Sequence, residues 1–210
     1  MKLIIVSDIH INSHFSKEEK FLELMSKIET DVLVINGDLY DLYVGPPLKD
    51  VHTTIRKNKN IKEVVYIRGN HDFHIGDYLK HHPIVDKYEI ADILITHGHQ
   101  YDFLSEPEPT GKGIGKWSVV FRNWVERIFN FNVRIVMKKV SFGLIDWMLF
   151  KAQKKAVESN PGKKVIIGHT HAPICEPPYY NTGCMVDEYF TYMVVNIDEE
   201  GNSSINLVHG

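Results

Sequence analysis

The sequence predicts an α/β protein, because short apolar runs alternate with segments of helical periodicity along much of its 210 residues. Runs of Val, Ile and Leu without polar alternation are typical of strands buried on both faces. Strand, helix, strand, helix, strand is the order of a layered α/β fold. The five runs are KLIIVSDIH (2–10), DVLVINGDLYD (31–41), KEVVYIRGNHD (62–72), ADILITHGH (91–99) and KKVIIGHTH (163–171).

Helices are expected between the first three runs, where apolar residues recur every three or four positions. The Ser16 and Glu19 pair matches a capping box, which predicts the start of the first helix. The residues that share one face are Phe21, Met25 and Ile28 in segment 16–29, and Leu48, Val51 and Ile55 in segment 46–58.

The end of the chain is β-rich and predicts antiparallel strands. Segments 189–198 and 202–210 are separated by the turn sequence DEEGN, and YYNTGCMV (179–186) precedes them. We therefore expect one domain over residues 1–210, with a helical insert at about 101–160.

The insert differs from the rest of the chain in charge and in aromatic content. Segment 111–155 contains ten Lys or Arg residues and only two acids, Glu126 and Asp146, which gives it a charge of +8. Because the whole chain carries −3, the remainder carries −11. An apolar face rimmed by cations suits an acyl chain or an anionic membrane surface. Packing on the sandwich or on another subunit is the alternative.

Composition narrows the class of protein. The net charge of −3 gives no reason to favour a nucleic-acid partner. Two cysteines cannot form a disulfide framework, so a reducing, cytoplasmic location is expected. The apolar start of the chain, 3–6, is too short for a signal peptide and is interpreted as a strand. No apolar run reaches the ~18 residues of a membrane-spanning helix.

Every one of the five runs ends in groups that can bind a metal ion. Functional groups of α/β sheets gather beyond the carboxyl ends of the strands, so these side chains are expected to converge. His169 and His171, two positions apart, can then reach different sides of one site. The candidate ligands are Asp8, His10, Asp38, Asn70, His97, His169 and His171.

Carboxylate, amide and imidazole ligands together suit a divalent ion such as Mn, Fe or Zn, and Mn is expected first. Seven ligands exceed the roughly four to six positions of a single ion. Two ions bridged by one carboxylate can use them all, and Asp38 is the natural bridge. Two metals about 3.5–4 Å apart suit phosphoryl transfer, since they stabilise both the attacking and the leaving oxygen.

The ordered blocks resemble those of the calcineurin-like metallophosphoesterases. They are Asp8-x-His10, Gly37-Asp38, Gly69-Asn70-His71-Asp72, His97 and Gly168-His169-Thr170-His171. The resemblance implies a four-layer α/β/β/α sandwich. It also implies that one metal is bound by Asp8, His10 and His171, that the other is bound by Asn70, His97 and His169, and that Asp38 bridges them.

The same resemblance assigns the catalytic residues. His71 would lie beside the scissile phosphate and either help to neutralise it or protonate the leaving oxygen, with Asp72 orienting it. A hydroxide that bridges the metals would attack phosphorus in line, without a covalent enzyme intermediate.

The sequence of the second block indicates which class of substrate the chain is expected to hydrolyse. Protein phosphatases of this superfamily carry an arginine after it, and GDLYDLYVG (37–45) has none. GDLYD is instead similar to GDLFE of the UDP-2,3-diacylglucosamine hydrolases, which carry a helical insert in the same place and cleave a nucleotide–lipid pyrophosphate. Their third block often reads GNRD, where this chain has His71.

We therefore expect a metal-dependent hydrolase of a phosphodiester or pyrophosphate bond, attached to a small molecule or a lipid. A phosphomonoesterase or nucleotide phosphohydrolase, and a non-catalytic scaffold, are the alternatives. The residues expected to contact the substrate are Asp41, His99, Trp117, Phe121 and Trp124.

Overall fold

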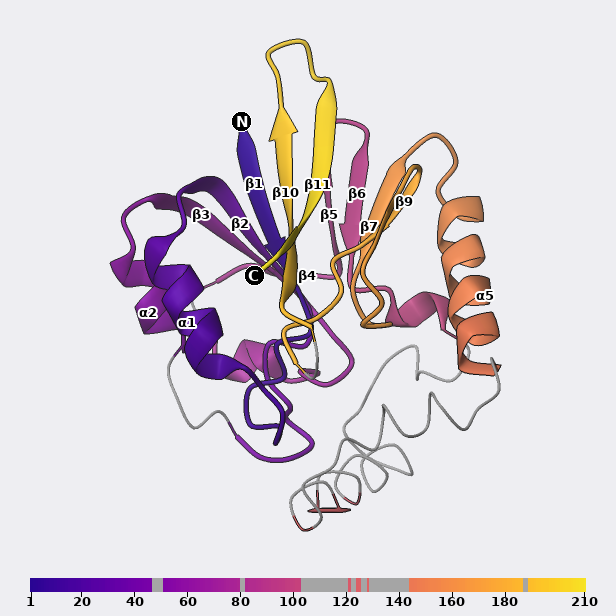
Figure 1. Ribbon diagram of the computed structural model, residues 1–210. Helices are drawn as coiled ribbons and strands as arrows, with labels where there is room; N and C mark the ends of the chain where they lie inside the picture. The colour runs from indigo at the N-terminus through magenta and orange to yellow at the C-terminus, as the bar shows by residue number, and fades with distance from the viewer. Residues whose placement is uncertain are drawn as a thin grey trace.

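Two β-sheets lie face to face and carry helices on their outer surfaces (Figure 1). The computed structural model describes residues 1–46, 51–79, 82–102, 144–186 and 189–210, together with Phe121, Trp124, Val125 and Ile128. This arrangement confirms the expected α/β/β/α layers. No helix within those ranges is both long and apolar enough to cross a membrane.

The first sheet has the strand order β11-β10-β1-β2-β3-β4. Strands β1 to β4 run parallel, while β10 pairs antiparallel with both β1 and β11. The last strands of the chain therefore complete the sheet that the first strand begins. Their bounds are β1 Lys2–Val6, β2 Thr30–Asn36, β3 Ile61–Ile67, β4 Ile84–Val85, β10 Thr191–Ile197 and β11 Ser203–His209.

The second sheet has the order β5-β6-β7-β9-β8. Here β6, β7 and β9 run parallel, and the edge strands β5 and β8 are antiparallel to their neighbours. The strands are β5 Lys87–Ile90, β6 Ile93–Thr96, β7 Lys164–Ile167, β8 Ile174–Glu176 and β9 Tyr179–Asn181.

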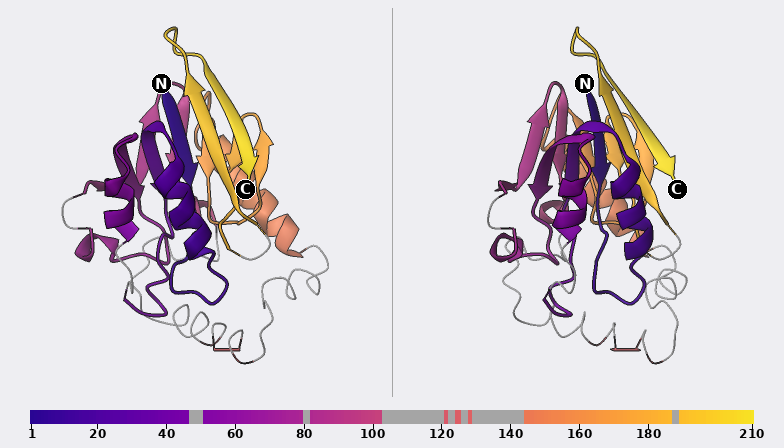
Figure 2. Two further views of the ribbon diagram at one scale, coloured as in Figure 1. Left: turned by 60° about the vertical axis from the view of Figure 1, so that its left-hand side comes forward. Right: turned by 90° about the vertical axis from the view of Figure 1, so that its left-hand side faces the viewer.

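Helices cover both outer faces of the sandwich. Figure 2 shows α1 (Glu18–Lys27) and α2 (Val51–Lys57) over the first sheet and α5 (Leu144–Glu158) on the opposite side. Two short 3-10 helices, η1 (Ile75–Asp77) and η2 (His99–Tyr101), lie in the connections.

The first predicted run is apolar throughout because strand β1 is buried on both faces. Leu3 and Ile5 face the second sheet, whereas Ile4 and Val6 face the α1 side, because successive side chains point to opposite faces of a strand. Burying each such side chain contributes about 1.5–3 kcal/mol. An Ile5→Ala change would leave a cavity between the sheets and cost about 2–5 kcal/mol.

The expected apolar faces of the helices are buried. Phe21 and Met25 of α1, and Val51 and Ile55 of α2, pack on the first sheet, and Ala156 of α5 packs on the second. Leu48 lies outside the described residues.

The capping-box prediction was wrong. Helix α1 begins at Glu18, with Lys17 at its N-cap and no side-chain cap bond. Ser16 Oγ donates instead to the backbone oxygen of Ile9, 3.0 Å away, so its hydroxyl holds the loop that follows β1.

Candidate metal centre

The predicted ligands leave their strands in an unusual backbone conformation. Asp8 and His10 follow β1, Asp38 follows β2, and His169 and His171 follow β7, with φ angles of 51°, 48°, 54°, 60° and 57°. Positive φ is uncommon for residues other than glycine and costs about 1–3 kcal/mol each. Only Asn12 and Ala91 share it among the other described non-glycine residues. Strain concentrated at these five positions indicates that the loops are built for a site.

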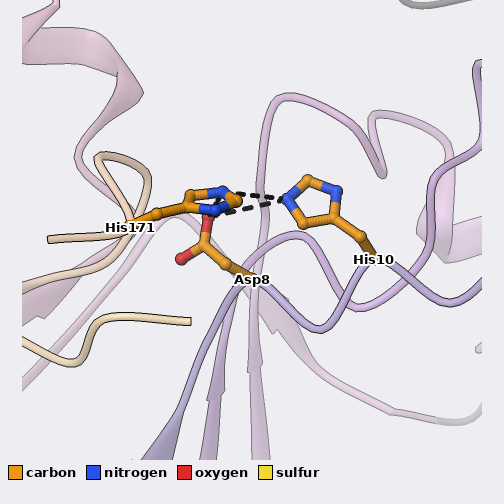
Figure 3. A group of neighbouring side chains, drawn as sticks. All are labelled: Asp8, His10 and His171. Atoms are coloured by element: carbon orange, nitrogen blue, oxygen red, sulfur yellow. Dashed lines mark hydrogen bonds and ion pairs between the residues drawn. The ribbon is translucent and has the colours of Figure 1, made fainter. Parts of the chain in front are cut away.

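The first metal group is Asp8, His10 and His171, whose side chains come from opposite ends of the chain and point toward one another (Figure 3). His171 Nε2 lies 3.1 Å from Asp8 Oδ1, and His10 Nε2 lies 3.8 Å from the same oxygen. The two Nε2 atoms are 3.2 Å apart. Three ligand atoms therefore face one small volume at the junction of the two sheets.

The residues predicted to bind a second metal are Asn70, His97 and His169, called the second metal group below, and they also lie close together. Asn70 Oδ1 lies 3.2 Å from His97 Nε2 and 3.0 Å from His169 Nδ1. His97 is fully buried, and its other ring nitrogen lies 2.8 Å from the backbone oxygen of Asn36 at the end of β2. This contact turns His97 Nε2 toward the group.

Asp38 lies between the two groups. Its Oδ2 atom is 3.6 Å from His10 Nε2 and 3.3 Å from His97 Nε2. Its Oδ1 atom accepts the backbone N–H of His71 at 2.8 Å, which fixes the orientation of the carboxylate. The expected central position of Asp38 is therefore found.

The charges of the centre are strongly coupled. Burial is the largest single influence and favours neutral Asp8 and Asp38. The surrounding histidines, led by His171 at Asp8 and by His97 at Asp38, together outweigh it, so both carboxyl pKa values lie below their usual range. Burial likewise opposes a charged His97, yet Asp38 and then Asp8 raise the pKa of His97 to about 10. The carboxylates stay ionised and attract positive charge.

Two glycines of the motifs leave room for these side chains. A Cβ on Gly69 would overlap Asp38 Oδ1, and a Cβ on Gly168 would overlap Asp8 Oδ2 and Ser7 Oγ. Both motif glycines are therefore required by close approach.

The His71 ring faces a different carboxylate from the one expected. His71 Nδ1 lies 3.2 Å from Asp41 Oδ1, and the buried Asp41 also reaches to 3.9 Å from His10 Nδ1. Asp41, which was expected to contact the substrate, is thus buried behind the two imidazoles.

Asp72, expected to orient His71, has both oxygens on backbone donors. Its Oδ2 accepts Leu39 N–H at 2.8 Å and its Oδ1 accepts Gly69 N–H at 2.7 Å. Burial, reinforced by Asp38, raises the pKa of Asp72 to about 7. Asp72 ties the loop after β3 to the loop after β2, so it positions Asp38 and Asn70.

Among the other predicted contacts, His99 has its ring centroid 5.5 Å from that of His97 and 6.3 Å from that of His169. Burial, followed by the charge of His97, lowers the pKa of His99 to about 3, so this ring is neutral. Phe121 and Trp124 are 64% and 55% exposed, with ring centroids 6.0 Å apart. Trp117 lies outside the described residues.

One carboxylate was missed by sequence reasoning. Asp102, just after η2, places Oδ2 3.0 Å from His169 Nε2, although 67 positions separate the two residues. A second hydrogen-bonding partner on a metal-binding histidine is a common signal, but only once the ring orientation is known.

The profile of the calcineurin-like phosphoesterase family matches residues 1–173. The chain belongs to this family. UDP-2,3-diacylglucosamine hydrolase from Blochmanniella floridana is 23% identical over 254 residues, covering 100% of this chain and 98% of that protein. Phosphodiesterase YfcE from Escherichia coli K12 is 29% identical over 110 residues, which cover 48% of this chain and 59% of that protein.

Solved structures of Vps29 are also similar to this calcineurin-like phosphoesterase. The Entamoeba histolytica wild-type protein complexed with Zn²⁺ has a TM-score of 0.48 and 14% identity, and covers 100% of this chain and 99% of its own. Vps29 from Chaetomium thermophilum has a TM-score of 0.47 and 12% identity, with coverage of 99% and 93%.

The residues present fit the divalent metals that such phosphoesterases use. Carboxylate and imidazole are suitable ligands for Zn, Mn or Fe. The described residues contain three sets whose ligand atoms lie within 4.8 Å of one another: Asp8, His10 and His171; His10, Asp41 and His71; and Asp8, Asp38 and His97.

Proposed function

We propose that this calcineurin-like phosphoesterase binds two divalent metal ions, Mn before Fe or Zn, and hydrolyses a phosphodiester or pyrophosphate bond of a nucleotide-linked lipid. The observation that carries the proposal is the place of Asp38, with one oxygen within 3.6 Å of a ring nitrogen of each metal group. A carboxylate shared in this way lets seven ligands serve two cations.

Asp8, His10 and His171 would hold one cation, and Asn70, His97 and His169 the other, with Asp38 shared. Bound there, the cations supply Lewis acidity, which lowers the pKa of water and offsets charge on phosphoryl oxygens. The strained loops keep the ligands in place before binding, so little reorganisation is needed.

His71 acts on the leaving group. The carboxylate of Asp41, with Oδ1 3.2 Å from His71 Nδ1, orients the ring so that a proton on Nε2 can be donated. Donation to the departing oxygen is general acid catalysis, worth about 10²–10⁴-fold. Asp41 thereby takes the orienting role that sequence reasoning gave to Asp72.

The lipid part of the proposal is supported by exposed aromatic side chains on α5. Trp147 and Phe150 are 49% and 60% exposed, and Lys151 Nζ lies 3.8 Å above the Trp147 ring. Aromatic surface beside cations suits an acyl chain and an anionic headgroup. Similarity to UDP-2,3-diacylglucosamine hydrolase points the same way. The enzyme would then work in the cytoplasm, at the membrane surface.

Hydrolysis assays with Mn²⁺ test the function. UDP-2,3-diacylglucosamine, the same nucleotide sugar without acyl chains, bis(p-nitrophenyl) phosphate and p-nitrophenyl phosphate would be compared by kcat/KM. We expect the acylated pyrophosphate to be the best substrate. Higher kcat/KM on the monoester would establish the phosphomonoesterase alternative, and no turnover of any of them, with metals bound, would favour a scaffold.

A further inference from the structure

Asp102 occupies a particular place in the chain. It follows η2, at the point where the loop after β6 leads into the predicted insert. Its Oδ2 lies 3.0 Å from His169 Nε2, and the two side chains are 24% and 11% exposed. The opposite ring nitrogen, His169 Nδ1, lies 3.0 Å from Asn70 Oδ1. The His169 ring is thus held between a carboxylate and the metal centre.

The chemistry of the two contacts fixes the proton on the ring. An ionised carboxylate only accepts hydrogen bonds, so the nitrogen beside Asp102 must be the one that carries hydrogen. A neutral imidazole has a single N–H, which leaves a lone pair on Nδ1. That lone pair faces the amide oxygen of Asn70, another acceptor. A cation satisfies two acceptors that converge in this way.

We propose that Asp102 is a positioning residue, which holds His169 as the Nε2–H tautomer and so raises the cation affinity of the second metal group. The proposal rests on the two-metal function proposed above. Carboxylate partners of this kind change metal affinity by about 10–100-fold.

The two histidines of the second metal group have different kinds of hydrogen-bonding partner on the side that faces away from the site. His97 Nδ1 lies 2.8 Å from a backbone oxygen, that of Asn36, so side-chain substitution cannot remove its partner. His169 has a side-chain partner instead, at the entrance to the insert.

Three variants separate charge, hydrogen bonding and general structural effects. Asp102→Ala removes the acceptor. Asp102→Asn removes the charge but can keep an oxygen beside Nε2. Asp86→Asn is the matched control, since it removes an exposed carboxylate whose ion pair with Arg68 lies on the surface.

Two readouts other than activity test the proposal. The first is Mn²⁺ and Zn²⁺ affinity of each of the two sites, by chelator competition. We expect one site to weaken about 100-fold in Asp102→Ala and about tenfold in Asp102→Asn, while the other site and the Asp86→Asn protein stay within twofold of wild type. Unchanged affinity at both sites in Asp102→Ala would overturn the proposal.

The second readout is the tautomer of His169 in metal-free wild-type protein, from ¹⁵N-histidine NMR with His169→Gln for assignment. A protonated Nε2 is expected, and a protonated Nδ1 would contradict the proposal even if a variant failed to fold. Binding of fewer than two metals by wild type would instead refute the two-metal function, and the tautomer would still report on Asp102.

Discussion

The two metal groups differ in how their histidines are held. In the second group, the ring nitrogens that face away from the site contact Asn36 O at 2.8 Å and Asp102 Oδ2 at 3.0 Å. In the first group, His10 Nδ1 lies 3.9 Å from Asp41 Oδ2, beyond hydrogen-bond distance. Hydrogen bonds therefore orient the second group before a cation arrives, whereas His10 depends more on the ligand atoms it faces.

Asp38→Asn has the largest expected effect, because it removes the charge that both groups share. The amide can keep the 2.8 Å contact with His71 N–H, so the fold should persist. Loss of several kcal/mol of transition-state stabilisation corresponds to about 10³-fold or more in kcat. Metal analysis and kcat would be measured beside Asp86→Asn, which changes an exposed carboxylate paired with Arg68. Two bound metals and near-normal kcat would rule out a bridge.

His71→Ala should lower kcat by about 10²–10⁴-fold with both metals retained, because His71 serves the leaving group and neither cation. The loss should shrink with p-nitrophenolate, which leaves without a proton. Asp41→Asn should act in the same direction but less strongly. An equal loss on good and poor leaving groups would contradict the role of general acid.

The second metal group is expected to release a proton when it binds a cation. The pKa of His97 is raised to about 10, so metal-free protein carries this proton at pH 7, and a cation must displace it. Affinity at one site should rise about tenfold per pH unit from pH 7 toward 10. Calorimetry in buffers of different ionisation enthalpy counts the protons. A pH-independent affinity at both sites would contradict the assignment.

The same shift affects metal-free stability. Because the folded-state pKa of His97 exceeds its usual value, its contribution is complete below about pH 6.5 and is lost as pH rises toward 10. Thermal unfolding of metal-free protein should show this decline, and a metal-loaded sample should not.

The smallest effect is expected for exposed side chains of α5, which belong to neither metal group. Trp147→Ser with Phe150→Ser should raise KM for the acylated substrate about tenfold, because two exposed aromatic contacts are lost. Metal affinity and turnover of bis(p-nitrophenyl) phosphate should stay unchanged. Vesicle co-sedimentation with anionic lipid would report on membrane contact. An unaltered KM for the acylated substrate would show that Trp147 and Phe150 of α5 do not contribute to substrate binding.

Much of the centre was visible in the sequence because its ligands follow recognisable apolar strands. Parallel strands end on one side of a sandwich, so Asp8, Asp38 and His97 could be expected together without coordinates. Strands β4, β5 and β8 were not predicted, since runs of two to four residues are too short to show a periodicity.

Side-chain orientation could not be predicted. Pairing of His71 with Asp41 rather than Asp72 depends on which way each carboxylate turns after its strand, and neighbouring positions do not determine that. Asp102 and His169 meet only through tertiary packing. The positive φ angles of Asp8 and the other strained ligands could not be predicted either. These positions are occupied by aspartate and histidine, whereas a glycine would have indicated that conformation.

Anomalous diffraction from crystals grown with Mn²⁺ tests the shared role of Asp38 most directly. We expect two peaks, one among Asp8, His10 and His171 and the other among Asn70, His97 and His169, with an Asp38 oxygen coordinated to both. A single peak, or two peaks of which only one touches Asp38, would contradict the two-metal centre.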